Sequence, residues 1–278
     1  MDKLYVPPRF QKAIAVHVVK NIMVLDSFRV PLVLGIHGPS GDGKTYQCEA
    51  TLAEMDARSF LISGGQLENK NAGEPARLIR ETYIEASRHM EKNAGVAVVL
   101  INDIDTGVGG WGGLVQYTVN RQTVFGELMH LTDYPTSVAG EAVKRVPIIV
   151  TGNDFTKLYE PFVRAGRMTS FEWKPTSDER SEIVARIFPE LTRDAVGQLL
   201  GQVDRKGQLP IAFYSHLRST LLDDFIWQEI GKVGMRDAVG YAVRGFRIKM
   251  EPLVRVDDII STAKSLIRSG NLANHLRR

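Results

Sequence analysis

The chain has 278 residues, of which 44% are hydrophobic and 24% are charged. This length allows two domains, and the composition is that of a globular protein. The 35 basic and 32 acidic residues give a net charge of +3, which argues against a dedicated nucleic-acid or anionic-membrane surface. No apolar run approaches the ~18–20 residues needed to cross a bilayer. We therefore expect neither a nucleic acid nor a membrane as a partner.

The first residues and the cysteine content bear on the cellular compartment. The N-terminus has neither the apolar core of a signal peptide nor the Arg/Ser-rich pattern of a transit peptide. The single cysteine, Cys48, cannot form an internal disulfide, which suits a reducing compartment. We expect Cys48 to be a small buried core residue rather than a redox switch.

Hydrophobic periodicity predicts the elements in chain order. A lead-in helix is predicted over 9–28, and its apolar face would consist of Ile14, Val18, Ile22 and Leu25. Short apolar runs predict strands at 32–37, 59–63, 96–102, 146–151 and 169–173. Helices are predicted at 44–56, 74–92, 115–131 and 178–187. This alternation predicts an α/β fold with a parallel sheet covered by helices on both faces.

The strand pattern stops after Lys174, where we place a domain boundary. Thr176 or Ser177 is expected to cap the next helix. The remaining residues predict a mainly helical region, with helices at 192–203, 211–230, 235–243 and 256–270.

Residues 38–45 read GPSGDGKT, a complete G-x-x-x-x-G-K-[ST] phosphate-binding loop between a predicted strand and a predicted helix. Its glycines let backbone N–H groups face the phosphates, Lys44 reaches the β- and γ-phosphates, and Thr45 places its hydroxyl on Mg²⁺. The alternative is a Gly-rich turn that only resembles such a loop. We expect ATP and Mg²⁺ as cofactors. The candidate nucleotide-binding residues of the loop are Gly38, Gly41, Asp42, Gly43, Lys44 and Thr45.

Acidic residues follow the apolar strand at 96–102. Nucleotide hydrolases with such a loop need a carboxylate here to hold Mg²⁺, and a neighbour to orient or deprotonate the attacking water. Asn102 replaces the first of the usual two acids, so Asp103 is the expected main catalytic carboxylate. The alternative is a surface turn. The candidate metal ligands are Thr45, Asn102, Asp103 and Asp105.

Two later features could complete the chemistry. Asn153 follows the strand at 146–151 and could reach the γ-phosphate or the attacking water, unless it only forms a turn. Arg164 and Arg167 lie three residues apart beside a glycine. They are either solvated surface residues or arginine fingers that neutralise charge at a neighbouring subunit's γ-phosphate, which requires an oligomeric ring.

Together these motifs resemble the AAA+ ATPases, and more closely the Rubisco activase family. The matching stretches are residues 30–36, 71–80, 101–103, 116–120, 146–155 and 166–168. The Asn-Asp pair at 102–103 is typical of that family, and His37 is similar to cyanobacterial members. The resemblance implies a linker and helix at 1–30, an AAA+ α/β nucleotide-binding subdomain at 31–174 and a helical small, or lid, subdomain at 175–278.

The resemblance also implies roles at individual positions. Arg218 matches a second nucleotide sensor, although the sequence alone shows only one arginine on a helix. Tyr5 matches a linker residue that packs near the nucleotide, and residues 232–244 fall where the family carries its Rubisco-contacting helix. The matching pore-loop residues are Glu68, Asn69, Lys70 and Asn71 in the first loop and Gly110 and Trp111 in the second.

By resemblance, the chain forms a hexameric ring that hydrolyses ATP and pulls on the Rubisco large subunit, which releases an inhibitory sugar phosphate. The expected location is the cytoplasm, in a cyanobacterial cytosol or carboxysome, or the chloroplast stroma for a plastid-bearing source. The chain departs from the family pattern at two places, because the family commonly has Arg-Met where this chain has Gly110-Trp111, and Asp where it has Ala165. The alternatives are an ATPase that modulates Rubisco or remodels another protein, and a nucleotide-switched scaffold with little turnover, which Asn102 favours.

Overall fold

The computed structural model describes residues 5–23, 29–68, 71, 73–93, 95–108, 115–245 and 255–269. The chain divides into two compact units, which we describe separately. The first is an α/β unit that extends from Val6 to Lys174. The second is helical and contains Tyr5 together with the residues from Pro175 onward.

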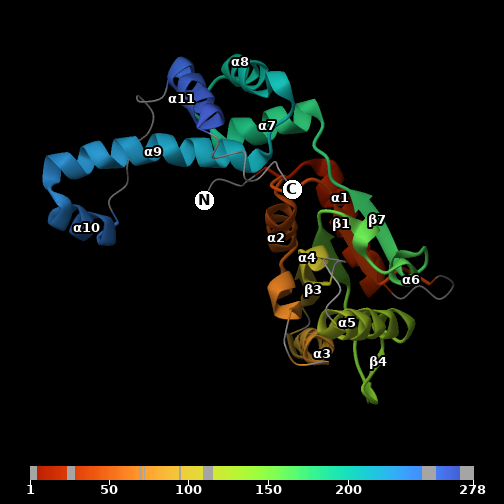
Figure 1. Cartoon of the computed structure of the whole chain (residues 1–278). Helices are drawn as coiled ribbons and strands as arrows, with labels where there is room; N and C mark the ends of the chain where they lie inside the picture. The colour runs from red at the N-terminus through yellow and green to blue at the C-terminus, as the bar shows by residue number, and fades with distance from the viewer. Residues whose placement is uncertain are drawn as a thin grey trace. The chain divides into compact units, whose positions relative to one another are not determined.

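A five-stranded parallel sheet forms the centre of the α/β unit (Figure 1). The strands are β1 (Val33–His37), β2 (Ala57–Ser63), β3 (Val96–Asn102), β6 (Ile148–Gly152) and β7 (Met168–Glu172). Their order is β2-β3-β6-β1-β7. Each predicted strand is confirmed, β3 with the predicted bounds and the other four with ends that shift by at most two residues. Because the strands are parallel, the loops that follow β1, β3 and β6 meet at one edge of the sheet.

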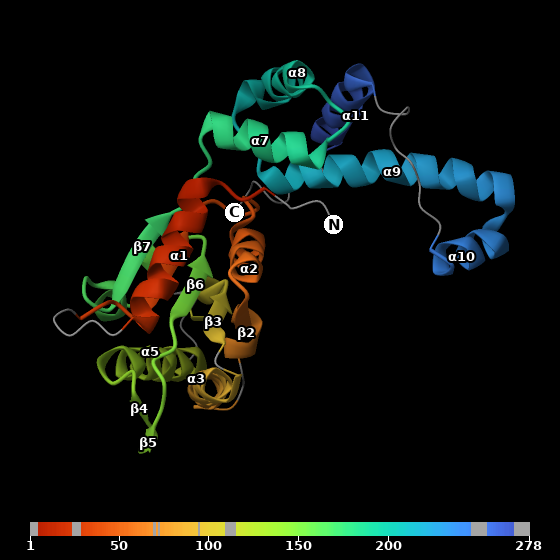
Figure 2. The same cartoon turned by 180° about the vertical axis from the view of Figure 1, so that it is seen from behind.

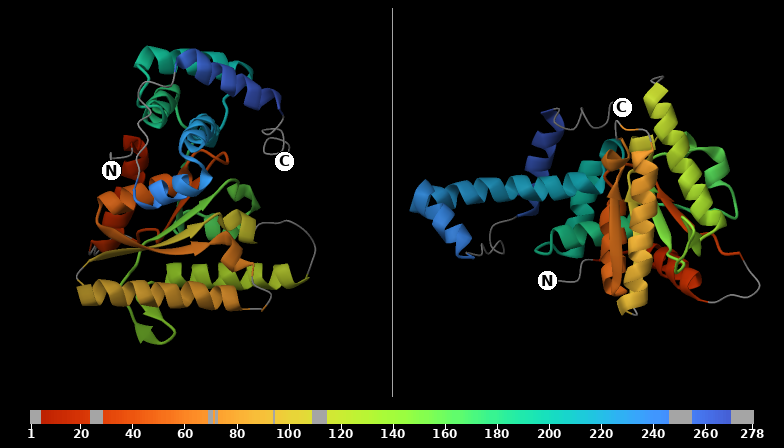
Figure 3. Two further views of the ribbon diagram at one scale, coloured as in Figure 1. Left: turned by 90° about the vertical axis from the view of Figure 1, so that its left-hand side faces the viewer. Right: turned by 90° about the horizontal axis from the view of Figure 1, so that it is seen from below.

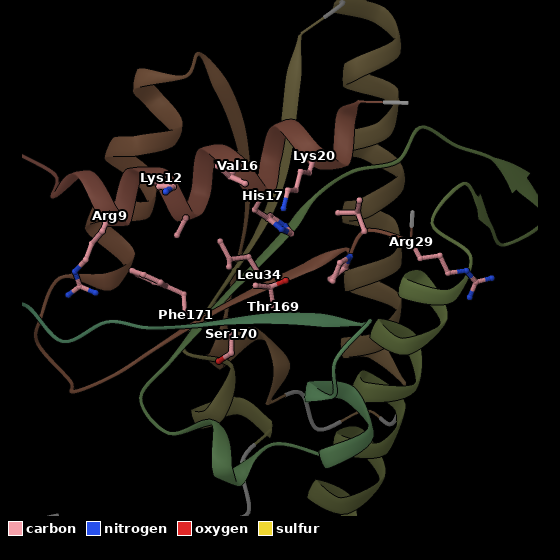
Figure 4. A pocket seen from close by; sticks show the side chains of 13 residues that line it. Arg9, Lys12, Val16, His17, Lys20, Arg29, Leu34, Thr169, Ser170 and Phe171 are labelled. Carbon is pink, nitrogen blue, oxygen red and sulfur yellow. The ribbon is translucent and has the colours of Figure 1, made fainter. Parts of the chain in front are cut away.

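Helices cover both faces of this sheet, as the sequence predicted. The main helices are α1 (Pro8–Ile22), α2 (Lys44–Glu54), α3 (Glu74–Asn93) and α5 (Val115–Asp133). Helices α3 and α5 lie along each other on one face (Figure 3). Val99, Ile101 and Ile148 of the sheet pack in the core that these helices close. Helices α1 and α2 contact each other and cover the face to which Leu34 points (Figure 4).

Helix α1 is shorter than predicted and buries different residues. It ends at Ile22 because Met23 adopts an extended backbone conformation. Ile14 and Val18 are buried as predicted, but Ile22 is 40% exposed, and Leu25 lies outside the described residues. His17 and Asn21 occupy the buried face instead. The His17 Nε2 lies 3.1 Å from the carbonyl oxygen of Ile148, and the Asn21 amide donates to the carbonyl oxygen of Pro31, so both polar side chains are satisfied.

Several short elements were not predicted. Two-residue strands and single helical turns are too short to carry a hydrophobic period. They are α4 (Ile104–Val108), α6 (Glu160–Val163), the hairpin of β4 (Ser137–Val138) and β5 (Glu141–Ala142), and the 3₁₀ turns η1 (Gly64–Leu67) and η2 (Phe155–Lys157).

The second unit contains the helices predicted after Lys174. They are α7 (Ser177–Ile187), α8 (Arg193–Val203), α9 (Ile211–Val233), α10 (Met235–Val243) and α11 (Val256–Arg268), with the 3₁₀ turn η3 (Asp204–Lys206) after α8. Thr176 caps α7 in a reciprocal arrangement with Glu179, which confirms the predicted cap. Val184, Leu199, Leu217 and Ile259 belong to its core. The end of α9 projects beyond that core and carries α10 beside it (Figure 2).

Candidate nucleotide-binding site

The phosphate-binding loop joins the end of β1 to the start of α2. Gly38, Gly41 and Gly43 have φ values of 149°, 82° and 76°, which side chains rarely tolerate. A Cβ on Gly38 would lie 2.0 Å from the carbonyl oxygen of Trp173. Gly43 directly precedes α2 and has no side chain to cap it, so backbone N–H groups of the first helical turn are available to an anion. This loop and helix terminus fit a phosphate group.

Lys44 connects the loop to the neighbouring strand β6. Its buried Nζ donates to the carbonyl oxygens of Gly38 at 2.8 Å and Pro39 at 2.9 Å, and to the Oδ1 of Asn153 at 2.9 Å. Burial lowers the pKa of Lys44, while the nearby negative charges, that of Asp103 first, oppose the shift. The structure therefore brings together the predicted residues of three loops, those after β1, β3 and β6.

Two residues that sequence reasoning missed hold the loop in place. The Trp173 Nε1 donates to the carbonyl oxygen of Asp42 at 2.8 Å, and the Gln47 Nε2 donates to the same oxygen at 3.2 Å. Trp173 is fully buried and packs edge-on against Phe10 with ring centroids 5.0 Å apart. Trp173 directly follows β7, at the same edge of the sheet as the loop. The position of Trp173 directly after a predicted strand is the sequence signal that could have placed it near the loop.

At the tip of β3, Asn102 and Asp103 have different surroundings. The buried Asn102 accepts a hydrogen bond through its Oδ1 from the Thr151 hydroxyl at 3.2 Å, and the same hydroxyl oxygen accepts from the Asp103 backbone N–H at 3.1 Å. Asp103 is exposed and has a left-handed backbone, with φ 51°. That conformation is costly for a residue other than glycine and is common at functional sites. Thr151 thus fixes the tip of β3, and the Asp103 side chain faces solvent.

Asp105 holds the backbone at the tip of β6 in place. Its side chain is only 2% exposed, and its Oδ2 accepts hydrogen bonds from the backbone N–H groups of Asn153 and Asp154, both at 2.9 Å. A side chain on Gly152 would collide with the same carboxylate, because a Cβ there would lie 2.7 Å from Oδ1. The carboxylate of Asp105 therefore positions Asn153, a role that the sequence analysis did not assign to it.

The donors at this edge fit a magnesium ion held together with nucleotide phosphates. Mg²⁺ prefers oxygen ligands and is usually bound through one or two carboxylates and substrate phosphates, with water completing the shell. Of the four predicted ligands, Asp103 has an exposed carboxylate, and Thr45 is half-buried in the first turn of α2. Asn102 and Asp105 are instead buried in hydrogen bonds to the protein. Of the four candidate ligands, Asp103 and Thr45 are therefore the ones with room for an ion.

Arg164 and Arg167 lie far from the phosphate-binding loop of their own subunit. The backbone N–H of Val33, at the start of β1, donates to the carbonyl oxygen of Arg167, whereas the loop follows the other end of β1, about 13 Å away along the strand. Arg167 is 16% exposed, and its guanidinium donates to Asp133 at 3.0 Å and to the carbonyl oxygen of Pro161 at 2.9 Å. Arg164 is exposed. Neither arginine can complete the site of its own subunit.

Arg218 and Tyr5 lie in the helical unit. The Arg218 guanidinium forms a two-pronged ion pair with Glu190, with distances of 2.6 and 2.9 Å, and also donates to the carbonyl oxygen of Ile187. Burial opposes ionisation of Glu190, but the hydrogen bonds from Arg218, a backbone hydrogen bond and the charge of Arg218 together outweigh it, so the pKa of this carboxyl is lowered. The pKa of Tyr5 is raised, first by burial and then by the charges of α7 residues Glu182 and Glu179.

The predicted pore-loop residues are only partly described. Glu68 follows η1 and Asn71 comes shortly before α3, and both are exposed. Asn69, Lys70, Gly110 and Trp111 lie outside the described residues. At the base of the first loop, the Gly73 N–H donates to the Oδ1 of Asn120 at 3.2 Å. Asn120 is in α5, the helix that follows the second loop, so this bond joins the bases of both segments.

Residues 34–176 match the family model described as the ATPase family associated with various cellular activities (AAA). The chain belongs to the AAA family. Membership accounts for the arrangement of the site, in which a phosphate-binding loop lies beside the tips of β3 and β6, and it implies nucleotide binding. The matched residues begin in β1 and include the rest of the α/β unit.

This AAA chain is similar to proteins named ribulose bisphosphate carboxylase/oxygenase activase. It is 42% identical to the protein of Nostoc sp. over 276 residues, which covers 96% of this chain and 65% of that protein. It is 45% identical to the protein of Anabaena sp. over 238 residues, which covers 83% of this chain and 57% of that protein. It is 43% identical to the chloroplastic protein of Phaseolus vulgaris over 247 residues, which covers 86% of this chain and 55% of that protein. The chain thus spans between half and about two thirds of these relatives.

Proposed function

We propose that this AAA chain binds ATP with Mg²⁺ and hydrolyses it. The observation that carries the proposal is the position of Lys44, whose Nζ lies in a phosphate-binding loop and is 2.9 Å from the Oδ1 of Asn153. The N–H groups of the loop and of the first turn of α2 would hold the phosphates. Asp103 and Thr45 would hold the ion, which supplies charge neutralisation at the phosphates when bound. Asp103 would also orient or deprotonate the attacking water, and Asn153 would contact that water or the γ-phosphate.

The second part of the proposal is that catalysis needs a neighbouring subunit. Arg164 and Arg167 lie at the opposite end of β1 from their own loop, which supports a role at the γ-phosphate of the next subunit. An arginine supplied in this way neutralises transition-state charge and contributes large factors in rate. A closed ring, six-membered by resemblance, gives every subunit such a neighbour. We extend the proposal to Arg218 and Tyr5 as nucleotide contacts by resemblance alone.

The proposed substrate is Rubisco. The relatives named above support it because they are named activases and their similarity extends over most of this chain. Helix α10, where the family resemblance expects the contact with Rubisco, exposes Met235 and Val243 to 73% and 83%. Exposed large apolar side chains on a short helix suit a partner surface. In this proposal ATP turnover drives pulling by the loops around 68–73 and 107–113, and an inhibitory sugar phosphate is released. By resemblance, the protein would act in a cyanobacterial cytosol or carboxysome, or in a chloroplast stroma.

Phosphate release tests the ATPase, with Lys44→Ala as the inactive reference. Mixing Lys44→Ala subunits with Arg164→Ala subunits should restore part of the turnover, because mixed rings contain interfaces with an intact loop and an intact arginine. No recovery in rings proven to be mixed would contradict action between subunits. Recovery of carboxylation by inhibitor-blocked Rubisco then tests the substrate.

One alternative function is an AAA ATPase that modulates Rubisco or remodels another protein. Turnover without recovery of Rubisco would favour it. The other alternative is a nucleotide-switched scaffold, supported by the neutral Asn102 at the tip of β3. Nucleotide binding with no difference in phosphate release between the wild type and Lys44→Ala would favour that scaffold.

A further inference from the structure

A groove of about 610 Å³ lies between helix α1 and the edge of the sheet, on the α/β unit (Figure 4). Its interior is largely apolar, with Val16 of α1, Leu34 of β1 and Phe171 of β7 among the lining residues. This volume is in the range of protein sites that hold several side chains or a small ligand. The groove is separate from the phosphate-binding loop, and the proposed ATPase does not use it.

The charged side chains that line the groove are all basic. They are Arg9, Lys12, Lys20 and Arg29, and none of the lining residues is acidic. Arg9 already donates to the carbonyl oxygen of Lys174 and lies 4.7 Å from the centre of the Trp173 ring. Lys12, Lys20 and Arg29 are exposed. Four positive charges around an apolar interior select for an occupant with negative charge.

The backbone of β7 forms part of the groove. Thr169 and Phe171 point toward α1, whereas the side chain of Ser170 points away, so Ser170 contributes to the lining mainly through its backbone (Figure 4). Among the described residues, β1 is the only strand that pairs with β7. The opposite side of β7 is therefore a sheet edge.

The ladder with β1 fixes which groups face that edge. Val33 N–H donates to Arg167 C=O, and Trp173 N–H donates to His37 C=O. In a parallel ladder the N–H and C=O of one residue point to the same side, and alternate residues point to opposite sides. Residues 167, 169, 171 and 173 therefore face β1, whereas Met168, Ser170 and Glu172 present their N–H and C=O groups outward. The Met168 N–H already donates to the carbonyl oxygen of Arg164, so the outward groups of Ser170 and Glu172 are the ones that can pair with an added strand.

We propose that this groove binds an extended, acidic, amphipathic peptide segment of a partner protein. The segment would pair with the outer edge of β7 at Ser170. Its apolar side chains would enter the groove toward Leu34 and Phe171, and its carboxylates would face Lys12, Lys20 and Arg29. Main-chain pairing gives affinity in this kind of recognition, and alternate side chains give specificity.

The test is selection from a phage-displayed library of random peptides on the full chain, followed by anisotropy measurements with the strongest synthetic peptide. We expect enrichment of acidic sequences with alternating apolar residues. Ser170→Pro removes the outward N–H, at an edge position where proline is tolerated, and should weaken binding about five- to tenfold. Ser170→Ala keeps the N–H and should bind like the wild type. Thermal unfolding checks that both variants fold.

A charge-reversed pair tests the basic rim. Lys12→Glu/Lys20→Glu should weaken peptide binding at least tenfold. This effect should be smaller at high salt, because salt screens exposed charges. Lys92→Glu/Lys144→Glu changes the same charge at exposed sites away from the groove and should leave binding unchanged. The proposal is overturned if no acidic sequence is enriched, or if Ser170→Pro and the charge reversal leave binding intact. It is also overturned if the reversal changes the oligomeric state by light scattering while no peptide binds, because the occupant is then a second copy.

Discussion

The Nζ of Lys44 donates a hydrogen bond to the Oδ1 of Asn153 at 2.9 Å, and this bond joins the phosphate-binding loop to the tip of β6. The two other close acceptors of Nζ are carbonyl oxygens of the loop itself. Asn153 is therefore the protein group outside the loop that fixes the direction of the ammonium. Any phosphate that binds Lys44 must share or replace one of these acceptors, so the two residues act as a pair.

The first prediction separates the two members of that pair. Lys44→Ala should lower ATP turnover by at least about 100-fold, because the positive charge at the phosphates is lost. Asn153→Ala should lower turnover by about 10- to 100-fold and leave nucleotide affinity nearly unchanged, because the ammonium keeps its other acceptors. Phosphate release and the anisotropy of a fluorescent ATP analogue measure the two effects. Wild-type turnover in Asn153→Ala would rule out a catalytic role for Asn153.

The second prediction distinguishes Asp105 from Asp103. Asp105→Asn should lower the free energy of unfolding by about 2 kcal/mol, because a buried carboxylate that accepts two backbone N–H bonds is replaced by a neutral amide. Asp103→Asn should keep the stability, since that side chain is exposed, yet lose turnover. Denaturant unfolding and phosphate release give both values. Equal stability of the two variants would contradict the supporting role of Asp105.

The third prediction concerns the two arginines near β7. Arg164→Ala should leave the melting temperature unchanged and lower turnover only in the assembled protein. Arg167→Ala should lower stability by about 1–2 kcal/mol as well, because it breaks the contacts with Asp133 and with the Pro161 carbonyl. Calorimetry of unassembled protein at low concentration isolates the stability effect. Asp133→Asn serves as the matched control, and it should reproduce part of the stability loss. Equal melting temperatures for all three variants would show that the Asp133 contact contributes nothing.

The fourth prediction is a pH dependence caused by His17. Burial, opposed by the backbone hydrogen bonds and reinforced by the nearby charge of Arg145, lowers the pKa of His17 to about 4. Because the unfolded state has the higher pKa, it binds more protons between pH 6.5 and 4, and stability falls as the pH falls through this window. His17 should account for a loss of about 2 kcal/mol between pH 7 and 5.

Denaturant unfolding at a series of pH values measures this loss. His17→Gln should flatten the slope between pH 7 and 5, although the substitution lowers stability overall. His216→Gln changes an exposed histidine of α9 and should keep the wild-type slope. An unchanged slope in His17→Gln would mean that other groups cause the pH dependence.

The sequence by itself determined the nature of the strands, the helices after them and the phosphate-binding loop. These features depend on residues that are close together in the sequence. Apolar runs predict buried strands, and the geometry of a single turn explains the spacing between the glycines and Lys44. The same reasoning placed Asp103 and Asn153 at strand tips, and parallel pairing then brings such tips to one edge of the sheet.

Only the tertiary structure decided which polar side chains face the site and which support it. Asp105 is two residues from Asp103, yet its carboxylate is buried under Asn153, because a single turn at Ile104 directs the two side chains differently. Trp173 reaches the loop through β7, 131 residues along the chain from Asp42. Asp133 holds Arg167 across a gap of 34 residues, between the end of α5 and the start of β7. Contacts of this kind depend on how distant elements pack, and a local pattern contains no information about that packing.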